Sequence, residues 1–318
     1  MTQLEGVELT CSPEEAWQYH VSRQVKDADF STYRLPEFTE DPSEVYEFLR
    51  RAEQQLILNE DYQLGSAIVN NQLAVLRGES GVLLTAEHAT FHRRKRPDGT
   101  VYDKQPDTGT AALSMAVADK TNSDAIVAVG RQTGDPNYDP EHPFKKEVES
   151  IVARPVSQAH LALHGLMRAR ASNIDDKRGF AVLIGIGDNP SDATRTLAYD
   201  YLTAIGKDYD LAVGINQQHL RFDNNAKAPR LSPDGRIMTA IYMGTRNTTR
   251  AFSERISVSD HREKGFAALQ VELSDVLRVH PDRPVGSPIE FPSQRDREIG
   301  AYLGYMFILR AVGSVALL

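Results

Sequence analysis

Short apolar runs alternate with helical patterns along most of this chain, and this alternation constrains the fold more than any other feature of the sequence. From residue 72 onward, runs of strand length are separated by segments in which apolar residues recur at helical spacing. Strands that alternate with helices predict an α/β layer fold with a mixed, largely parallel sheet. We expect strands at residues 72–76, 81–86, 125–129, 160–163, 180–184, 211–215, 237–242 and 267–271.

The expected helices have recognisable ends. Pro42-Ser43-Glu44 is typical of a helix start and precedes apolar residues at helical spacing. Asp107 is placed to cap a helix that runs to Ala118. Pro190-Ser191 opens a further helix, which Gly206 is placed to close.

The chain divides into two parts by its patterns. Residues 1–70 carry two amphipathic helical patterns and no chemistry-bearing motif, which predicts an N-terminal helical extension. Residues 71–318 carry the strands, and we expect them to form one domain, the candidate catalytic domain. The extension either covers the site or mediates dimerisation, so a homo-oligomer is among the expected states.

Composition excludes several classes of protein. A balance of 36 basic and 44 acidic side chains, with a net charge of -8, argues against a nucleic-acid or membrane-surface binder. The single Cys11 excludes an internal disulfide framework and a cysteine metal cluster. The apolar stretch 299–309 ends at Arg310 and is too short to span a bilayer core of ~30 Å. With no signal-peptide pattern at the N-terminus, we expect a cytoplasmic protein.

Polar residues that directly follow the apolar runs are the first candidates for a site. In open α/β sheets, ligands bind at the carboxyl ends of the strands. Two histidines, two carboxylates, an arginine and an asparagine occupy such positions, namely Glu87, His88, Arg131, His164, Asn216 and Glu272. This combination is what metal-assisted amide hydrolysis requires, because a catalytic Zn²⁺ takes about three His or carboxylate ligands and keeps one position for water.

Each candidate has a role that fits its chemistry. His88 and His164 are the candidate metal ligands. Glu272 would take a proton from the attacking water and deliver it to the leaving nitrogen. Arg131 would hold a substrate carboxylate by a bidentate pair or stabilise the oxyanion.

The same residues also have ordinary structural interpretations. A single histidine after a strand is more often packed and hydrogen-bonded than a ligand. Asp107 is equally typical of a helix cap, and Glu272 is equally placed to start a helix. The basic run at residues 93–96 places His92 in a solvated loop rather than in the helix of a HExxH metalloprotease. Only the joint occurrence of the candidates favours an enzyme.

Five short segments carry a family resemblance over residues 81–278. They are Thr85-Ala86-Glu87-His88-Ala89, Asp107-Thr108-Gly109-Thr110-Ala111, Arg131-Gln132-Thr133-Gly134-Asp135-Pro136-Asn137, Leu163-His164-Gly165-Leu166 and Ala268-Leu269-Gln270-Val271-Glu272-Leu273. In this order they resemble the motifs of the N-formylglutamate amidohydrolase family.

The resemblance implies a fold, a metal and a reaction. The fold is an α/β/α sandwich related to the zinc-dependent exopeptidases, and the reaction is hydrolysis of an N-acyl bond next to a carboxylate. The resemblance implies that His88 and His164 bind one Zn²⁺, with Glu87 or Asp107 as carboxylate ligand and Glu272 as general base. Neighbouring residues of an extended chain point in opposite directions, so Glu87 and His88 can both be ligands only if the chain turns there.

The substrate is expected to be small and acidic. Arg131 would hold its carboxylate, and Asp135, Asn137 and Asn216 are expected to contact it. Tyr138 follows Asn137 where the family usually has an arginine, so one positive charge of the family pattern is missing.

Two other functions compete with hydrolysis. A carboxylate- or peptide-binding protein on the same fold would use Arg131 without a metal, but the presence of His88, His164 and Glu272 favours the enzyme. Nucleotide binding at Gly185-Ile186-Gly187 would require a third glycine that the segment lacks, and we interpret it as a turn.

Overall fold

The computed structural model describes most of the part of the chain in which strands are expected. The described residues are 41–58, 67–69, 72–95, 98–104, 106–130, 132–166, 180–187, 190–208, 212–214, 238–242, 265–274, 277–279 and 294–315. Residues 1–40 with Cys11, and the candidate site residues Arg131 and Asn216, lie outside these ranges.

The described helices and strands follow the predicted alternation. The helices are α2 (Pro42–Leu58), α3 (Thr110–Thr121), α4 (Pro143–Val152), α6 (Asp192–Asp208) and α8 (Gln294–Val315). The strands are β1 (Ala67–Val69), β2 (Leu73–Leu76), β3 (Val82–Ala86), β4 (His92–Lys95), β5 (Val101–Lys104), β6 (Asp124–Ala128), β7 (Ala159–Leu166), β8 (Phe180–Gly185), β9 (Ala212–Gly214), β10 (Met238–Tyr242) and β11 (Ala267–Ser274). All eight strands expected from the sequence are present.

One nine-stranded sheet has the order β1-β2-β6-β3-β7-β11-β8-β10-β9. Strands β6, β3, β7 and β11 are parallel, and so are β8, β10 and β9. The pairs β1–β2, β2–β6 and β8–β11 are antiparallel. The mixed, largely parallel sheet predicted from the sequence is confirmed.

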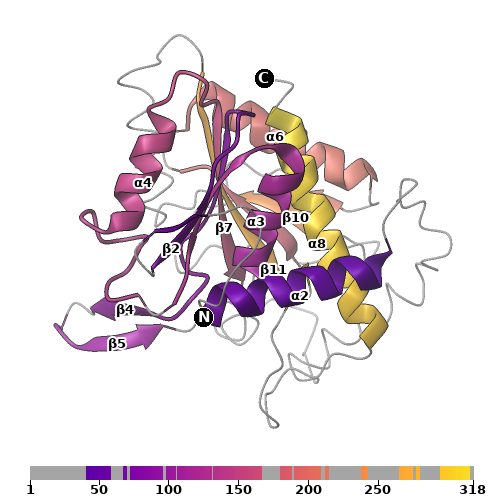
Figure 1. Ribbon diagram of the computed structural model, residues 1–318. Coiled ribbons are helices and arrows are strands. Elements are labelled where there is room, and N and C mark those ends of the chain that lie inside the picture. The colour runs from indigo at the N-terminus through magenta and orange to yellow at the C-terminus, as the bar shows by residue number, and fades with distance from the viewer. Residues whose placement is uncertain are drawn as a thin grey trace, which may run out of the picture.

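Helices cover both faces of this sheet and produce the expected three layers (Figure 1). Helix α4 lies on one face, whereas α3 and α6 pack on the strands of the other face. Helices α2 and α8 extend that second layer, because α2 packs against α3 and α8, and α8 packs against α6.

The central strands are apolar on one face and become polar on the other. On the face under α3 and α6, the residues Leu84, Leu163 and Val271 are fully buried in the larger core. On the α4 face, Leu83 and Ala268 pack with α4. Residues at alternate positions share a face, so Thr85, His164 and Glu272 continue this second face toward the carboxyl ends of β3, β7 and β11.

Two helix starts agree with their sequence signals. The Ser43 N–H donates to Asp41 Oδ1 at 2.9 Å just before α2. The Thr194 N–H donates to Ser191 Oγ at 3.1 Å at the start of α6. These caps satisfy backbone donors that the first turn of a helix leaves without partners.

The basic segment after His88 is a strand, and the expectation of a solvated loop is wrong for residues 92–95. Strand β4 pairs antiparallel with β5, apart from the main sheet. Alternation along β4 buries His92 and partly buries Arg94, while Arg93 and Lys95 are exposed. His92 and Arg94 thus point inward and alternate with two outward side chains. This alternation is hard to recognise in the sequence, because three of the four residues are basic.

The expected N-terminal extension is described only in part. Helix α2 packs on α3 and α8, and β1 adds a strand to the edge of the main sheet. The boundary at residue 70 stays a prediction. Among the described helices, none combines the length and apolar character needed to cross a membrane.

Candidate metal centre

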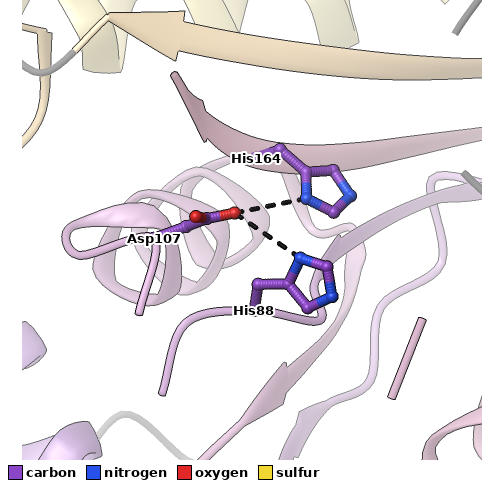
Figure 2. A group of neighbouring side chains, drawn as sticks. All are labelled: His88, Asp107 and His164. Atoms are coloured by element: carbon purple, nitrogen blue, oxygen red, sulfur yellow. Dashed lines mark hydrogen bonds and ion pairs between the residues drawn. The ribbon is translucent and has the colours of Figure 1, made fainter. Parts of the chain in front are cut away.

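Three of the predicted metal ligands meet at the carboxyl ends of β3 and β7 (Figure 2). His88 follows β3, His164 lies near the end of β7, and Asp107 precedes α3. Their exposed fractions are 3%, 4% and 3%, respectively. A charged group at this depth needs a partner, so the cluster requires compensation by protons or by a cation.

The distances within this cluster fit one divalent ion. Asp107 Oδ2 lies 3.3 Å from His164 Nδ1 and 3.7 Å from His88 Nδ1. Donor atoms bound at about 2.0–2.1 Å around a tetrahedral zinc lie roughly 3.3 Å from one another. Asp107 Oδ2 therefore lies from each imidazole nitrogen at about the separation that such an ion requires, and one ligand atom of each of the three residues lies within 4.8 Å of the others.

Glu87 lies on the opposite side of the His164 ring. The chain turns directly after β3, so the side chains of the adjacent residues Glu87 and His88 both reach the site. Glu87 Oε1 accepts from the Thr85 hydroxyl at 3.0 Å. Its Oε2 lies 3.5 Å from His164 Nε2 and has no hydrogen-bond partner among the described residues. Of the two carboxylates, Asp107 is the one that groups with both histidines, and its Oδ2 lies nearest their Nδ1 atoms.

Asp135 orients the ring of His88 from the other side. His88 Nε2 lies 3.0 Å from Asp135 Oδ1, which also accepts from the Asn137 N–H at 3.0 Å. Asp135 Oδ2 accepts from Arg94 Nε at 2.5 Å. A proton on His88 Nε2 donated to this carboxylate leaves the Nδ1 lone pair directed at Asp107, the usual arrangement of a metal-binding histidine.

The centre is rich in negative charge. Burial raises the pKa of Asp107, but Lys104 and the two histidines outweigh it and hold the pKa well below its usual range. Burial likewise raises the pKa of Asp135, yet His88 and Arg94 reverse the direction and lower it. Burial lowers the pKa of His164, but the carboxylates around it raise the pKa above its ordinary value. Ionised carboxylates around buried imidazoles attract a cation.

Glu272 lies beside His164 on the neighbouring strand. Strands β7 and β11 are parallel, and Glu272 is the register partner of His164. Its Oε1 accepts from Gln270 Nε2 at 2.6 Å, and the residue is partly exposed. The alternative that Glu272 starts a helix is wrong, because β11 continues through Ser274.

The expectation that Asp107 caps α3 is wrong. The N-cap position belongs to Gly109, which has a φ of 87° and no side chain to act as a cap. Glu53 of α2 fills the role, since its two oxygens accept from the Gly109 N–H at 2.6 Å and the Ala112 N–H at 2.9 Å. Asp107 therefore directs its carboxylate to the histidines instead of to the helix.

Arg278 holds the two segments that carry the ligands. Its Nη1 donates to the Thr108 carbonyl, next to Asp107. A Cβ atom on Gly165, next to His164, would lie 2.6 Å from the same nitrogen. No local pattern singles out Arg278, Arg94 or Glu53, because their roles depend on segments far away along the chain. Among the described residues, the only local feature that relates to Arg278 is the glycine at position 165, where a larger residue would collide with its guanidinium.

Two of the substrate-binding candidates lie next to the centre. Asp135 and Asn137 are buried beside His88, whereas Arg131 and Asn216 are outside the described residues. The substrate contacts of these four residues stay predictions.

Comparisons with known proteins do not identify the function, so the proposal for it depends on the geometry of the site. No protein-family model and no curated protein matches the chain. Among solved structures, a Zn-dependent exopeptidase from Parabacteroides distasonis is 10% identical, with 95% of this chain and 97% of that chain covered and a TM-score of 0.30. Glutaminyl cyclase from Porphyromonas gingivalis is 10% identical over 95% and 98%, with a TM-score of 0.28. Methylthioadenosine phosphorylase from Schistosoma mansoni is 11% identical over 74% and 90%, with a TM-score of 0.26. Similarities at this level carry no functional argument.

Proposed function

We propose that this protein is a metal-dependent hydrolase that cleaves the amide bond of an N-acyl amino acid, of the formyl type, or of a short acidic peptide. The observation that carries the proposal is the buried cluster of His88 Nδ1, His164 Nδ1 and Asp107 Oδ2, with separations of 3.3 and 3.7 Å. The motif resemblance to the N-formylglutamate amidohydrolases supplies the class of substrate.

The surrounding residues prepare both histidines as ligands. The carboxylate of Asp135 hydrogen-bonds to His88 Nε2 at 3.0 Å, whereas Glu87 Oε2 faces His164 Nε2 at an ion-pair distance of 3.5 Å. Each ring then presents Nδ1 to Asp107, where a metal ion such as Zn²⁺ would be held. When bound, such an ion lowers the pKa of a coordinated water to about 7 and polarises a carbonyl group.

Glu272 is the proposed general base. It stands opposite His164 on the adjacent strand and is partly exposed, so its carboxylate borders both the centre and the solvent. The hydrogen bond from Gln270 holds one oxygen in place. The carboxylate takes a proton from the attacking water and then gives it to the leaving nitrogen.

Positive side chains border the centre and suit an acidic substrate. Arg94 and Lys104 are 20% and 11% exposed and lie next to Asp135 and Asp107. We propose that Arg131 binds the substrate carboxylate as a bidentate pair, with Asp135, Asn137 and Asn216 completing the pocket. 

Metal content tests the proposal directly. Protein purified without a metal-affinity column should contain about one equivalent of zinc, and the separate variants His88→Ala and His164→Ala should contain none. His142→Gln is a matched control, because it removes another buried histidine, the one that caps α4. Loss of zinc in the control as well would show a general effect on folding.

Turnover of N-acyl amino acids, beginning with formylglutamate, tests the base. Glu272→Gln should keep the zinc and lose hydrolysis. Full activity in this variant would show that Glu272 is not the base. Absence of zinc from the wild type, even after zinc is added, would favour a carboxylate-binding protein that acts without a metal.

A further inference from the structure

A second group of potential metal ligands shares His88 with the proposed centre. His88, His92 and Asp135 each offer one ligand atom, these atoms lie within 4.8 Å of one another, and all three residues are buried. The separations are 3.0 Å from His88 Nε2 to Asp135 Oδ1 and 3.7 Å from His92 Nε2 to Asp135 Oδ2. By residue type and spacing, this group suits a second divalent ion once the Nε2 proton of His88 has been released to solvent. The ring of His88 would then lie between the two ions, with one nitrogen toward each.

The orientation of His92 directs an electron pair into this second group. His92 is fully buried, and its Nδ1 lies 3.2 Å from the Thr90 carbonyl, which can only accept, so Nδ1 carries the proton. Its ring stacks on that of His88 with centroids 4.2 Å apart and planes 7° apart. None of the described residues hydrogen-bonds to His92 Nε2, which faces Asp135. Two acceptors that face each other in the interior require a cation or a water nearby.

Arg94 already brings a cation to this position. Its Nε lies 2.5 Å from Asp135 Oδ2, and its Nη2 lies 3.3 Å from His88 Nε2. Arg94 and His92 are two residues apart on β4, so both side chains point to the same side. The guanidinium also lies over the ring of Tyr138, 4.9 Å from its centroid, which fixes it from the outside.

We propose that Arg94 takes the place of a second metal ion and keeps the centre mononuclear. The inference rests on the proposed metal centre and adds to it. A divalent ion on His88 Nε2, His92 Nε2 and Asp135 would meet the guanidinium at close range, and burial of these three residues strengthens the repulsion between the two cations. Arg94 also occupies the oxygen of Asp135 that His92 faces. Removal of Arg94 should therefore create a second site for zinc or a similar ion.

Zinc stoichiometry tests this inference without any measurement of activity. Wild type, Arg94→Met and Arg93→Met would be stripped with a chelator, loaded with zinc alone, dialysed and analysed for metal and protein. We expect one ion per chain in the wild type and two in Arg94→Met. Arg93→Met is the matched control, because it removes the same charge from the exposed side of β4, and it should keep one ion.

The location of the second ion is tested by a double variant. Arg94→Met with His92→Gln should return to one ion, because His92 belongs to the second group and not to the first. Arg94→Gln carries the same expectation as Arg94→Met and replaces it if the apolar side chain impairs folding.

The outcomes separate this inference from the proposed function. Two ions in the wild type would overturn the role of Arg94 and leave a dinuclear hydrolase in place. One ion in both Arg94 variants would also overturn that role and leave a mononuclear hydrolase in place. A second ion that persists in the double variant would also overturn it. A wild type without zinc would overturn the metal centre itself and both proposals with it.

Discussion

Glu53 connects the stability of the fold to the position of Asp107, and its titration can be measured. The side chain is fully buried in α2 and accepts two backbone hydrogen bonds at the start of α3. Burial raises its pKa from 4.5 to about 7, against these hydrogen bonds and the charge of Arg278. The folded state thus binds the proton more tightly than the unfolded state. The stability that this group contributes is fully present below pH 4.5 and is lost as the pH rises to about 7.

Glu53→Gln removes this titration and keeps the shape of the side chain. The interval from 4.5 to about 7 corresponds to about 3 kcal/mol at ~1.36 kcal/mol for each pH unit. The free energy of unfolding of the variant, relative to wild type, should therefore increase by about 3 kcal/mol from pH 4.5 to pH 8. A second, pH-independent effect is expected to lower the free energy of unfolding of the variant by about 1–3 kcal/mol, because the new NH₂ group faces one of the two backbone donors. The change with pH is superimposed on this constant loss.

Urea denaturation followed by circular dichroism measures this change. The protein must be metal-free, since metal binding depends on pH by itself. Glu47→Gln on the same helix is the control, because the side chain of Glu47 is 44% exposed, and its difference from wild type should not vary with pH. A Glu53→Gln difference that is the same at pH 4.5 and pH 8 would refute the reasoning about burial.

Three further changes test the centre and its support. Asp135→Asn should weaken zinc binding about 10- to 100-fold in a chelator competition, because the carboxylate orients His88, and an unchanged affinity would contradict that role. Gly109→Ala should lower the free energy of unfolding in urea by roughly 1–3 kcal/mol, because φ is 87° and a Cβ would lie 2.5 Å from the Val279 carbonyl oxygen. Leu113→Ala in the fully buried part of α3 should cost about 2–5 kcal/mol and leave the zinc content unchanged.

The layered fold and part of the centre followed from local patterns. Strand runs such as 81–86 are buried on both faces and are apolar apart from Thr85, which makes them visible in the sequence. The side chain after such a run lies at the carboxyl edge of the sheet, which is why His88, His164 and Glu272 could be proposed together. Parallel pairing of β7 and β11 then places Glu272 opposite His164.

The roles of Asp107, Glu53 and Arg94 could be assigned only from the tertiary structure. The local sequence of Asp107 suits a helix cap and a metal ligand equally. Glu53, which lies 56 residues from Gly109, settles the question by satisfying the N-terminal donors of α3. Arg94 is likewise one charge in a basic run until β4 turns it toward Asp135, 41 residues away. The spacing of apolar residues along a helix or strand indicates which of its sides is buried, because the side on which a residue lies depends on its position along the chain. The partner that a polar side chain meets depends on how distant segments pack, and no local pattern contains that information.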